Sequence, residues 1–242
     1  MILNAEFLKK IKEIVPSENI LLNEPMAKHT TFKIGGPADI FIMVSSVQEV
    51  SQIIKLCRNK QVPVHVLGNG SNILVLDKGI RGVLLKFGDN LAEMKFQNNK
   101  FIIGAGALLK DVAKFSAENG HCGMEFAVGI PGSIGGAVFM NAGAYEGEMS
   151  KVVEVVTAVN DKGEIVEYNN DEINFSYRHS IFQDNKNIVC EVTLNLKDGI
   201  KNIINEKMDD FTTRRESKQP LDMPSAGSTF KRPAGYFAGT LI

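Results

Sequence analysis

The spacing of apolar residues along the chain predicts four helices. The first lies within residues 1–15, where apolar side chains recur at helical spacing between lysines; it lacks the continuous apolar stretch of a signal peptide. The second opens on the capping box Ser46-Val47-Gln48-Glu49, and the third, Leu108–Asn119, is closed by Gly120 in the C′ position. The fourth covers residues 200–217 and stops before Pro220, with an apolar face made of Ile200, Ile203, Ile204, Met208 and Phe211.

Short apolar and β-branched runs predict the strands. A first group comprises Asp39–Val44, Val62–Leu67, Ile73–Leu76 and Gly82–Phe87. A second group comprises the hairpin of Ala92–Phe96 and Phe101–Gly104, joined through Asn98-Asn99, the pair Val152–Val159 and Glu164–Tyr168, and the run Ile188–Leu196. Strands and helices follow no regular βαβ period, which favours an α+β fold over a doubly wound sheet. We expect units at residues 1–87 and 88–199, and a third domain that begins at about residue 200 and is cut off.

Composition and charge narrow the class of partner. The chain has 242 residues, of which 44% are hydrophobic and 23% charged, as in an ordinary soluble globular protein. Its net charge of −1 gives no global basic field to attract nucleic acid or anionic lipid. A local basic spot, Arg214-Arg215 with Lys218, is nevertheless suited to one phosphorylated small molecule. Cys57, Cys122 and Cys190 are far apart and indicate reduced thiols in a cytoplasmic protein.

Two further features exclude a membrane span and a metal site. Residues 126–145 carry no charge and could nominally cross a bilayer, but the segment contains five glycines and a proline, which would repeatedly weaken or break a helix. We expect a buried loop structure there. The four histidines are isolated from one another in the sequence, so no metal site is expected.

The first glycine-rich loop, Gly68-Asn69-Gly70-Ser71-Asn72, lies between two predicted strands. Glycines allow positive φ, so successive backbone N–H groups can turn toward one anion, and Ser71 and Asn72 add side-chain donors. The loop lacks the following helix of a Rossmann fingerprint and the Gly-Lys-Ser/Thr of a P-loop. An ordinary hairpin turn remains the alternative.

The second loop, Gly129-Ile130-Pro131-Gly132-Ser133-Ile134-Gly135-Gly136, concentrates glycine in an apolar setting. Glycine costs chain entropy, so this density indicates that a ligand or another backbone approaches closely. The alternative is a tight structural crossover. Residues 141–145 continue the small-residue surface.

Two later clusters bear groups that can take part in a reaction. Tyr177-Arg178-His179-Ser180 sets a guanidinium beside a phenol and an imidazole, which suits a carboxylate or phosphate, although a surface salt bridge would use the same arginine. Neighbours on a strand point to opposite faces, so a joint role of Arg178 and His179 does not follow. Residues 225–233 combine hydroxyls with Lys231 and Arg232, and a hydroxyl there could deliver a proton. The alternative is a hydroxyl-rich turn.

These clusters, in this order, resemble the MurB family of UDP-N-acetylenolpyruvoylglucosamine reductases, flavoenzymes of peptidoglycan precursor synthesis. The matching segments are residues 30–38, 67–75, 129–145, 177–178, 217–220 and 225–233. The resemblance implies the FAD-binding fold of vanillyl-alcohol oxidase and p-cresol methylhydroxylase relatives. That fold has two α+β subdomains that grip FAD, and the family adds an α/β substrate domain, which is incomplete in this chain.

The resemblance also implies a reaction. NADPH would reduce a non-covalently bound FAD, and the reduced flavin would deliver hydride to UDP-N-acetylglucosamine enolpyruvate to give UDP-N-acetylmuramate. Arg178 would stabilise the resulting enolate and Ser228 would protonate its carbon. Substrate contacts would come from Tyr177, Lys218 and Lys231. Cofactor contacts would come from Gly68, Asn69, Gly70, Ser71, Asn72, Gly129, Ile130, Pro131, Gly132, Ser133, Gly135, Gly136 and Arg214.

The chain departs from the family at its end. The family has a catalytic glutamate in a further C-terminal segment, whereas this sequence stops at Ile242. We therefore expect weak or absent reductase activity from residues 1–242 alone. Two other functions stay open, namely another oxidoreductase of the same FAD-binding superfamily and a non-catalytic FAD- or nucleotide-binding module. We expect a cytoplasmic monomer with a UDP-sugar and NADPH as partners, and neither nucleic acid nor membrane.

Overall fold

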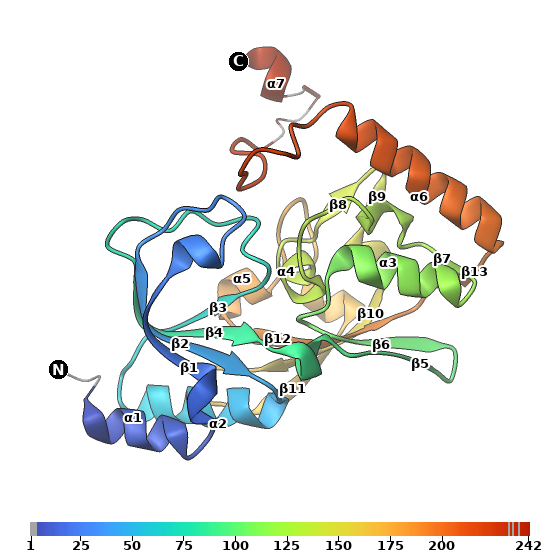
Figure 1. Cartoon of the computed structure of the whole chain (residues 1–242). Coiled ribbons are helices and arrows are strands. Elements are labelled where there is room, and N and C mark those ends of the chain that lie inside the picture. Colours follow the sequence, from blue (N-terminus) through green and yellow to red (C-terminus); the bar gives the residue numbers. More distant parts are fainter. Residues whose placement is uncertain (1–3, 232, 234, 237) are drawn as a thin grey trace.

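Two β-sheets form the framework of the chain (Figure 1). The computed structural model describes residues 4–231, 233, 235, 236 and 238–242. The helices are α1 (Ala5–Lys12), α2 (Val47–Asn59), α3 (Leu109–Glu118), α4 (Ile134–Phe139), α5 (Phe182–Asn185), α6 (Lys201–Glu216) and α7 (Ala238–Leu241). The strands are β1 (Ile20–Pro25), β2 (Pro37–Val44), β3 (Val64–Leu67), β4 (Ile80–Phe87), β5 (Met94–Gln97), β6 (Lys100–Gly104), β7 (His121–Cys122), β8 (Gly143–Ala144), β9 (Gly147–Glu148), β10 (Val153–Val159), β11 (Ile165–Asn169), β12 (Ile188–Leu194) and β13 (Lys197–Asp198).

The first sheet has the order β1-β2-β4-β3. Strands β2, β4 and β3 run parallel, and β1 is an antiparallel edge strand. Because side chains alternate along a strand, Leu85 packs in the core shared with α1 and α2, whereas Leu84 belongs to a smaller core on the other face. Helices α1 and α2 lie together on one side of this sheet (Figure 1).

The second sheet is wholly antiparallel, in the order β11-β10-β12-β6-β5. Its inner face packs against α3 and α4 in the largest core of the described residues. The predicted hairpin is confirmed at β5 and β6. Its turn residues Asn98 and Asn99 have φ of 50° and 58°, the two left-handed positions of a type I′ turn.

The two sheets share a core around α2. Val159, Ile188 and Cys190 of the second sheet pack among residues of α1 and α2, and the Ser51 hydroxyl of α2 donates to the carbonyl of Gly163 over 2.5 Å. Residues on both sides of position 87 thus contribute to one hydrophobic cluster. These contacts hold the two expected units together. The division at residues 87 and 200 itself stays a prediction.

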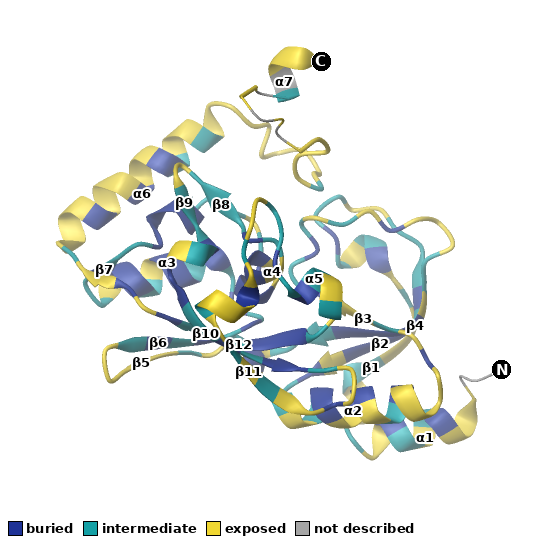
Figure 2. Cartoon of the chain, turned by 180° about the vertical axis from the view of Figure 1, so that it is seen from behind, coloured by how far each residue is buried: buried dark blue, intermediate teal, exposed yellow. Residues whose placement is uncertain are grey.

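The predicted helices are confirmed at α1, α2, α3 and α6, with two corrections of detail. At the start of α2, Ser46 caps the N–H of Glu49 as expected, but the Glu49 carboxylate accepts from the N–H of Ser45. On α6, the predicted apolar face is only partly buried, since Ile200 and Ile203 are 66% and 58% exposed. This helix lies across α3 at the edge of the molecule (Figure 2), so only its inner face, with Ile204, Met208 and Phe211, is covered.

The predicted strand Ile73–Leu76 is wrong. The structure assigns no strand to these residues, which form part of the connection from β3 back to the start of β4. Two parallel neighbours require such a crossover, so the segment runs back over the sheet instead of pairing within it. Burial of Val75 and hydrogen bonds to the carbonyl of Leu76 from Gly36 (3.1 Å) and Gly79 (2.8 Å) fix it.

The expected loop at residues 126–145 contains helix α4 instead. Gly135 lies on this helix, close to Ala105. A Cβ added to Gly135 would lie 2.8 Å from the Ala105 Cβ. The glycine thus lowers helix propensity but allows the helix to approach the neighbouring backbone. Among the described residues, no helix is both long and apolar enough to cross a membrane.

Candidate functional site

The first glycine loop, residues 68–72, leaves the carboxyl end of β3. Because β3 and β4 are parallel, the loop is not a hairpin turn, and that alternative is excluded. Gly70 has φ of 68°, and a Cβ there would collide with the carbonyl oxygen of His29. Its own carbonyl accepts the N–H of Thr31 over 3.1 Å. Glycine is therefore required at position 70 by a close approach of protein backbone.

The second glycine loop, residues 129–136, is paired with the segment that follows β6. The N–H of Leu109 donates to Gly132 O over 2.9 Å, and the N–H groups of Ile134 and Gly135 donate to Ala107 O (2.8 Å) and Ala105 O (2.9 Å). These bonds engage the N–H of Gly135 with protein, and the backbone of Ala105 approaches this glycine closely, as in a tight structural crossover. A cofactor contact of Gly135 stays a prediction.

The two loops meet at the junction of the two sheets. The side-chain amide of Asn69 donates to the carbonyl of Pro131 over 2.9 Å. A Cβ built on Gly68 would lie 2.5 Å from the Ser133 hydroxyl, and one built on Gly132 would lie 3.8 Å from the Ser71 hydroxyl. A cavity of about 40 Å³ opens beside the first loop, and it is lined by Leu67, Gly68, Asn69, Lys86, Phe87, Gly106 and Leu108. Three segments distant in the sequence thus build one small crevice with a largely apolar lining.

Ser133 is a buried polar group without a partner, and its hydroxyl lies against Gly68. Its side chain is 3% exposed, and its hydroxyl has no hydrogen-bond partner among the described residues. It makes no capping bond to α4, although it occupies the N-cap position. Buried hydroxyls are normally hydrogen-bonded, so one left free beside Gly68 indicates that a ligand supplies the missing partner.

Arg178 lies in a tight turn, which corrects the expectation of a strand. Ser176 and His179 exchange both backbone hydrogen bonds (3.1 and 3.2 Å), and Arg178 has φ of 57°. The guanidinium donates to the carbonyls of Gly143 (3.1 Å) and Asn141 (3.5 Å) and lies 5.1 Å from the centre of the Tyr177 ring. None of the described carboxylates pairs with it. The guanidinium is thus oriented by backbone while its charge stays uncompensated.

His179 separates from Arg178 in the folded chain. Its Nε2 lies 3.2 Å from a carboxylate oxygen of Asp184, close to α5. The expectation that no joint role follows for the two neighbours agrees with this arrangement. The two side chains diverge because they occupy successive positions of a turn, and not because side chains alternate along a strand.

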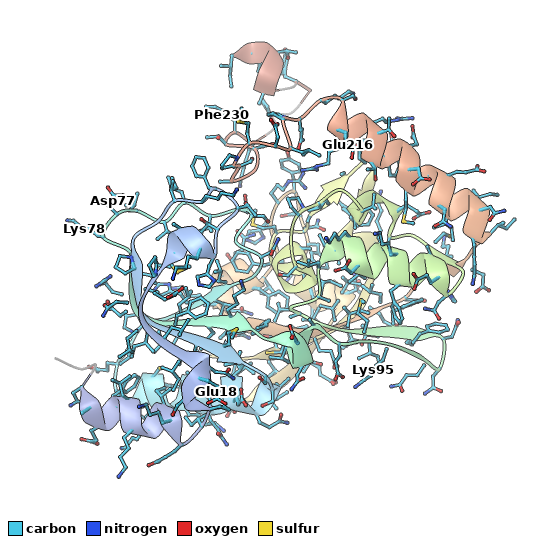
Figure 3. The ribbon with its side chains drawn as sticks, viewed as in Figure 1. Glu18, Asp77, Lys78, Lys95, Glu216 and Phe230 are labelled. Carbon is cyan, nitrogen blue, oxygen red and sulfur yellow. The ribbon has the colours of Figure 1, made fainter. Side chains whose placement is uncertain are left out.

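The Ser228 segment packs beside the first glycine loop. The Thr31 hydroxyl donates to Ser225 O over 2.5 Å, and the Ser225 N–H donates to Thr31 O over 3.2 Å. A Cβ built on Gly227 would lie 3.5 Å from Ser71 O. Ser228, Lys218 and Lys231 are exposed, and Figure 3 shows the neighbouring Phe230 on the segment beyond α6. Arg232 and Phe237, and Met1 to Leu3 of the first predicted helix, lie outside the described residues.

Arg214 does not reach the second glycine loop. Its guanidinium is held by the Asp210 carboxylate, one turn earlier on α6, at 2.8 and 2.9 Å. The next residue, Arg215, takes that place: a Cβ on Gly129 would lie 2.8 Å from its Cδ. Burial lowers the pKa of the Arg215 guanidinium. Adjacent helical residues point about 100° apart, so Arg215 and not Arg214 lies against this glycine, and a cofactor role of Arg214 stays a prediction.

Most of this chain is similar to known proteins. Residues 38–169 match the family described as "FAD binding domain". A UDP-N-acetylenolpyruvoylglucosamine reductase of Clostridium perfringens (strain 13 / Type A) is 49% identical over 237 residues, which cover 98% of this chain and 78% of the relative. One of Alkaliphilus metalliredigens is 47% identical over 95% of this chain and 75% of its own length.

The chain belongs to the UDP-N-acetylenolpyruvoylglucosamine reductase family.

Solved structures extend the comparison to the fold. The crystal structure of the MurB reductase from Thermus caldophilus aligns with a TM-score of 0.79 at 34% identity, over 92% of this chain and 77% of that one. p-Cresol methylhydroxylase aligns at 0.57 with 12% identity, over 80% of this chain and 43% of that one. The predicted FAD-binding fold of the p-cresol methylhydroxylase type is thereby confirmed, as is the resemblance to the MurB family.

The crevice of this MurB-family chain fits the phosphates of FAD. The Ser133 hydroxyl without a partner lies against the bare Cα of Gly68, and the Asn69–Pro131 bond holds the two loops together. A hydroxyl without a partner beside a glycine loop suits phosphate oxygens, which only accept hydrogen bonds.

Sequence reasoning missed two residues that organise this site. Thr31 joins the first glycine loop to the Ser228 segment, and its signal was present in the matched motif at residues 30–38. Asn141 is 2% exposed, donates to Ser176 O over 3.0 Å and accepts from Ser150 N over 3.0 Å. A buried asparagine between small residues was the available signal, because a buried amide requires partners.

Proposed function

We propose that this chain binds FAD non-covalently and, with NADPH as the reductant, reduces UDP-N-acetylglucosamine enolpyruvate to UDP-N-acetylmuramate. The observation that carries the proposal is the meeting of the two glycine loops around the free Ser133 hydroxyl. Membership of the reductase family, whose relatives carry that activity in their names, supports the choice of reaction. A flavin at this junction would contact Gly68 to Asn72 on one side and Ile130 to Ser133 with Gly136 on the other.

FAD, when bound and reduced by NADPH, supplies the hydride for the enolpyruvyl double bond of the substrate. The protein's part in the reaction begins with Arg178. Hydride addition leaves negative charge on the carbon next to the carboxylate and on the carboxylate itself. The Arg178 guanidinium, oriented by Asn141 O and Gly143 O, stabilises that charge. It is effective there because its turn fixes it and no described carboxylate neutralises it.

Ser228 supplies the proton in this proposal. A serine hydroxyl is a weak acid, so its alkoxide requires nearby cations or dipoles, and Lys231 is the candidate by proximity in the chain. The Thr31–Ser225 bonds support this role, since they tie the segment to the first glycine loop. Tyr177 and Lys218 complete the proposed substrate contacts, with the Lys218 ammonium directed to a phosphate of the UDP-sugar.

Arg215 is the cofactor residue that this proposal adds to Arg214. It is partly buried against Gly129, and burial lowers the pKa of its guanidinium, so an anionic ligand at the second loop would recover the cost of desolvation. The Arg215 side chain covers Gly129. Because Gly129 has no side chain, it leaves the space that Arg215 occupies. The proposal includes a cytoplasmic monomer, in the compartment where NADPH and UDP-sugars occur.

The absorbance spectrum of the purified protein tests the proposal. We expect a flavin spectrum that NADPH bleaches under anaerobic conditions and that the enolpyruvyl substrate restores. A purified chain that binds no FAD contradicts the proposal. A chain that binds FAD, whose oxidised flavin is bleached by simple alcohols and whose reduced flavin is not reoxidised by the enolpyruvyl substrate, favours another oxidoreductase of the same fold.

A further inference from the structure

Lys86 is a half-buried lysine at the carboxyl end of β4. In the parallel ladder it is the register partner of Leu67, the last residue of β3, so it stands beside the point where the first glycine loop begins. Its side chain lines the same cavity as Gly68 and Asn69. Because Leu84 and Lys86 share a face of β4, the Lys86 side chain leaves the sheet on the face of the smaller core that contains Leu84 and Leu67.

No described residue compensates the charge of Lys86. It forms no ion pair with the described carboxylates, and no charged group offsets the burial that lowers the pKa of its ammonium group. Lys100, by contrast, is paired with Glu154 at 2.6 Å, and Lys95 is paired with Glu93 at 2.9 Å. A partly desolvated cation without a partner costs stability, so it requires a reason to be there.

A second, independent observation points to the same spot from the other side. The Ser133 hydroxyl is buried, has no partner among the described residues, and would lie 2.5 Å from a Cβ on Gly68. The Ser133 hydroxyl therefore lies near Gly68, and Gly68 and Lys86 line the same cavity. The lining of the cavity thus contains the Lys86 ammonium group and no carboxylate, and the Ser133 hydroxyl adjoins Gly68 next to that lining. Such a set of donors suits a polyanionic oxygen ligand.

We propose that Lys86 contacts the diphosphate of the bound dinucleotide and neutralises part of its charge. This inference rests on the proposed flavin function and adds to it a cation that none of the sequence motifs contains. A lysine serves here as a point charge, and its long stem crosses the cavity wall while the head meets the anion. The diphosphate supplies the counter-charge that the protein itself lacks at this position.

The test measures FAD affinity and its salt dependence in the full chain. We expect Lys86→Met to weaken FAD binding about 10-fold or more, as for loss of a charge-assisted hydrogen bond. The dependence of affinity on salt concentration becomes shallower, because one charge contact is gone. Lys86→Arg keeps most of the affinity. Lys78→Met is the matched control, since Lys78 is exposed on the 73–79 connection (Figure 3) and lines no part of the cavity.

Two further readouts separate this role from a structural one. Riboflavin lacks the diphosphate, so Lys86→Met leaves its affinity unchanged. The apo variant unfolds at the same temperature as the wild type or a higher one, because a desolvated charge has been removed. Unchanged FAD affinity, or a loss of FAD affinity with the salt dependence of the wild type, overturns the inference while the flavin function stands. A wild-type chain that binds no FAD overturns both.

Discussion

The side-chain amide of Asn69 donates a hydrogen bond of 2.9 Å to the carbonyl oxygen of Pro131. The two residues are 62 positions apart, and each belongs to a glycine-rich loop from a different part of the fold. The bond joins the first glycine loop, which follows β3, to the second glycine loop, which precedes α4. It is the one described side-chain bond between the two loops, and the free hydroxyl of Ser133 lies next to it.

Removing this bond is expected to loosen the flavin site. Asn69→Ala loses a partly exposed hydrogen bond of about 1 kcal/mol, which corresponds to roughly a fivefold loss of FAD affinity if the loops must be held together to bind. Titration of the apo chain with FAD, followed by flavin fluorescence, measures the change. Asn119→Ala is the control, because Asn119 makes a similar bond (2.8 Å) to Phe115 O at the end of α3, away from the loops. Equal effects of the two substitutions on FAD affinity would speak against the role of Asn69.

Gly68 and Ser133 are expected to be coupled. Gly68→Ala places a methyl group 2.5 Å from the Ser133 hydroxyl, so it lowers both the free energy of unfolding and the FAD affinity. Ser133→Ala removes a buried hydroxyl without a partner, so it leaves stability unchanged or raised but weakens FAD binding. In the double variant we expect stability to return while FAD binding stays weak. A double-mutant cycle in urea unfolding measures the coupling, and strictly additive free energies would contradict it.

Thr31 is expected to hold the Ser228 segment in place. Thr31→Val removes the hydroxyl that donates to Ser225 O and keeps the shape of the side chain. Loss of one exposed bond opens the segment more often, so trypsin should cleave after Lys218 about threefold faster. Thr31→Ser retains the hydroxyl and should be cleaved at the wild-type rate. If Thr31→Val and Thr31→Ser are cleaved equally fast, the hydroxyl does not tether the segment.

Arg178 is expected to act in substrate reduction and not in flavin binding. Arg178→Asn keeps a residue that tolerates the left-handed backbone at φ of 57° while it removes the charge. The rate at which the enolpyruvyl substrate reoxidises the NADPH-reduced flavin should fall by about 100- to 1,000-fold, as when one oxyanion donor is removed. FAD affinity and bleaching by NADPH should be unchanged. Arg178→Lys, which lacks the two-pronged geometry, should recover only a small part of the rate.

The cysteines give a pH-dependent prediction. Burial raises the pKa of Cys57 and of Cys190 to about 12, so both remain protonated thiols in the folded chain up to strongly alkaline pH. In the unfolded chain a thiol ionises at about pH 8.5. The folded state therefore binds more protons above that pH, and stability is lost as the pH rises from about 8.5 toward about 12.

Thiol labelling measures how far burial protects each cysteine in the folded chain. Cys122 is less buried than the other two, so one equivalent of a thiol reagent should react at pH 8, and three after unfolding. The Cys122→Ser variant serves as the control and should leave the folded chain almost unreactive. Rapid labelling of three thiols in the folded wild type would show that Cys57 and Cys190 are not protected by burial.

The amphipathic helices and most strands followed from local pattern. Residues 47–59 and 109–118 carry both the periodic apolar face and the capping residues, so propensity and burial favour the same structure there. The strand predicted at Ile73–Leu76 shows the limit of such reasoning. Its β-branched residues suit a strand, but no ladder position was free for it, because β3 and β4 are parallel neighbours and the chain had to cross back over the sheet.

The candidate site was predicted in part. The two glycine loops were found because glycine density marks close approach, and Ser133 was among the residues chosen. Arg214 was chosen in place of Arg215 because the sequence does not say which of two adjacent cations faces the loop, and the orientation of α6 decides it. Lys86 had no signal at all, since it is a single lysine at the end of an apolar strand.

The sequence by itself determined the periodic helices, the hairpin turn at residues 98–99, and the residue types gathered in the two glycine loops. These depend on side-chain chemistry and backbone freedom within a few positions. The tertiary structure alone decided that Asn69 meets Pro131, that Ser133 is left without a partner, and that Lys86 lines the crevice beside Gly68. Such contacts depend on how two sheets pack around a shared core, and packing joins residues whose separation in sequence carries no record of their distance in space.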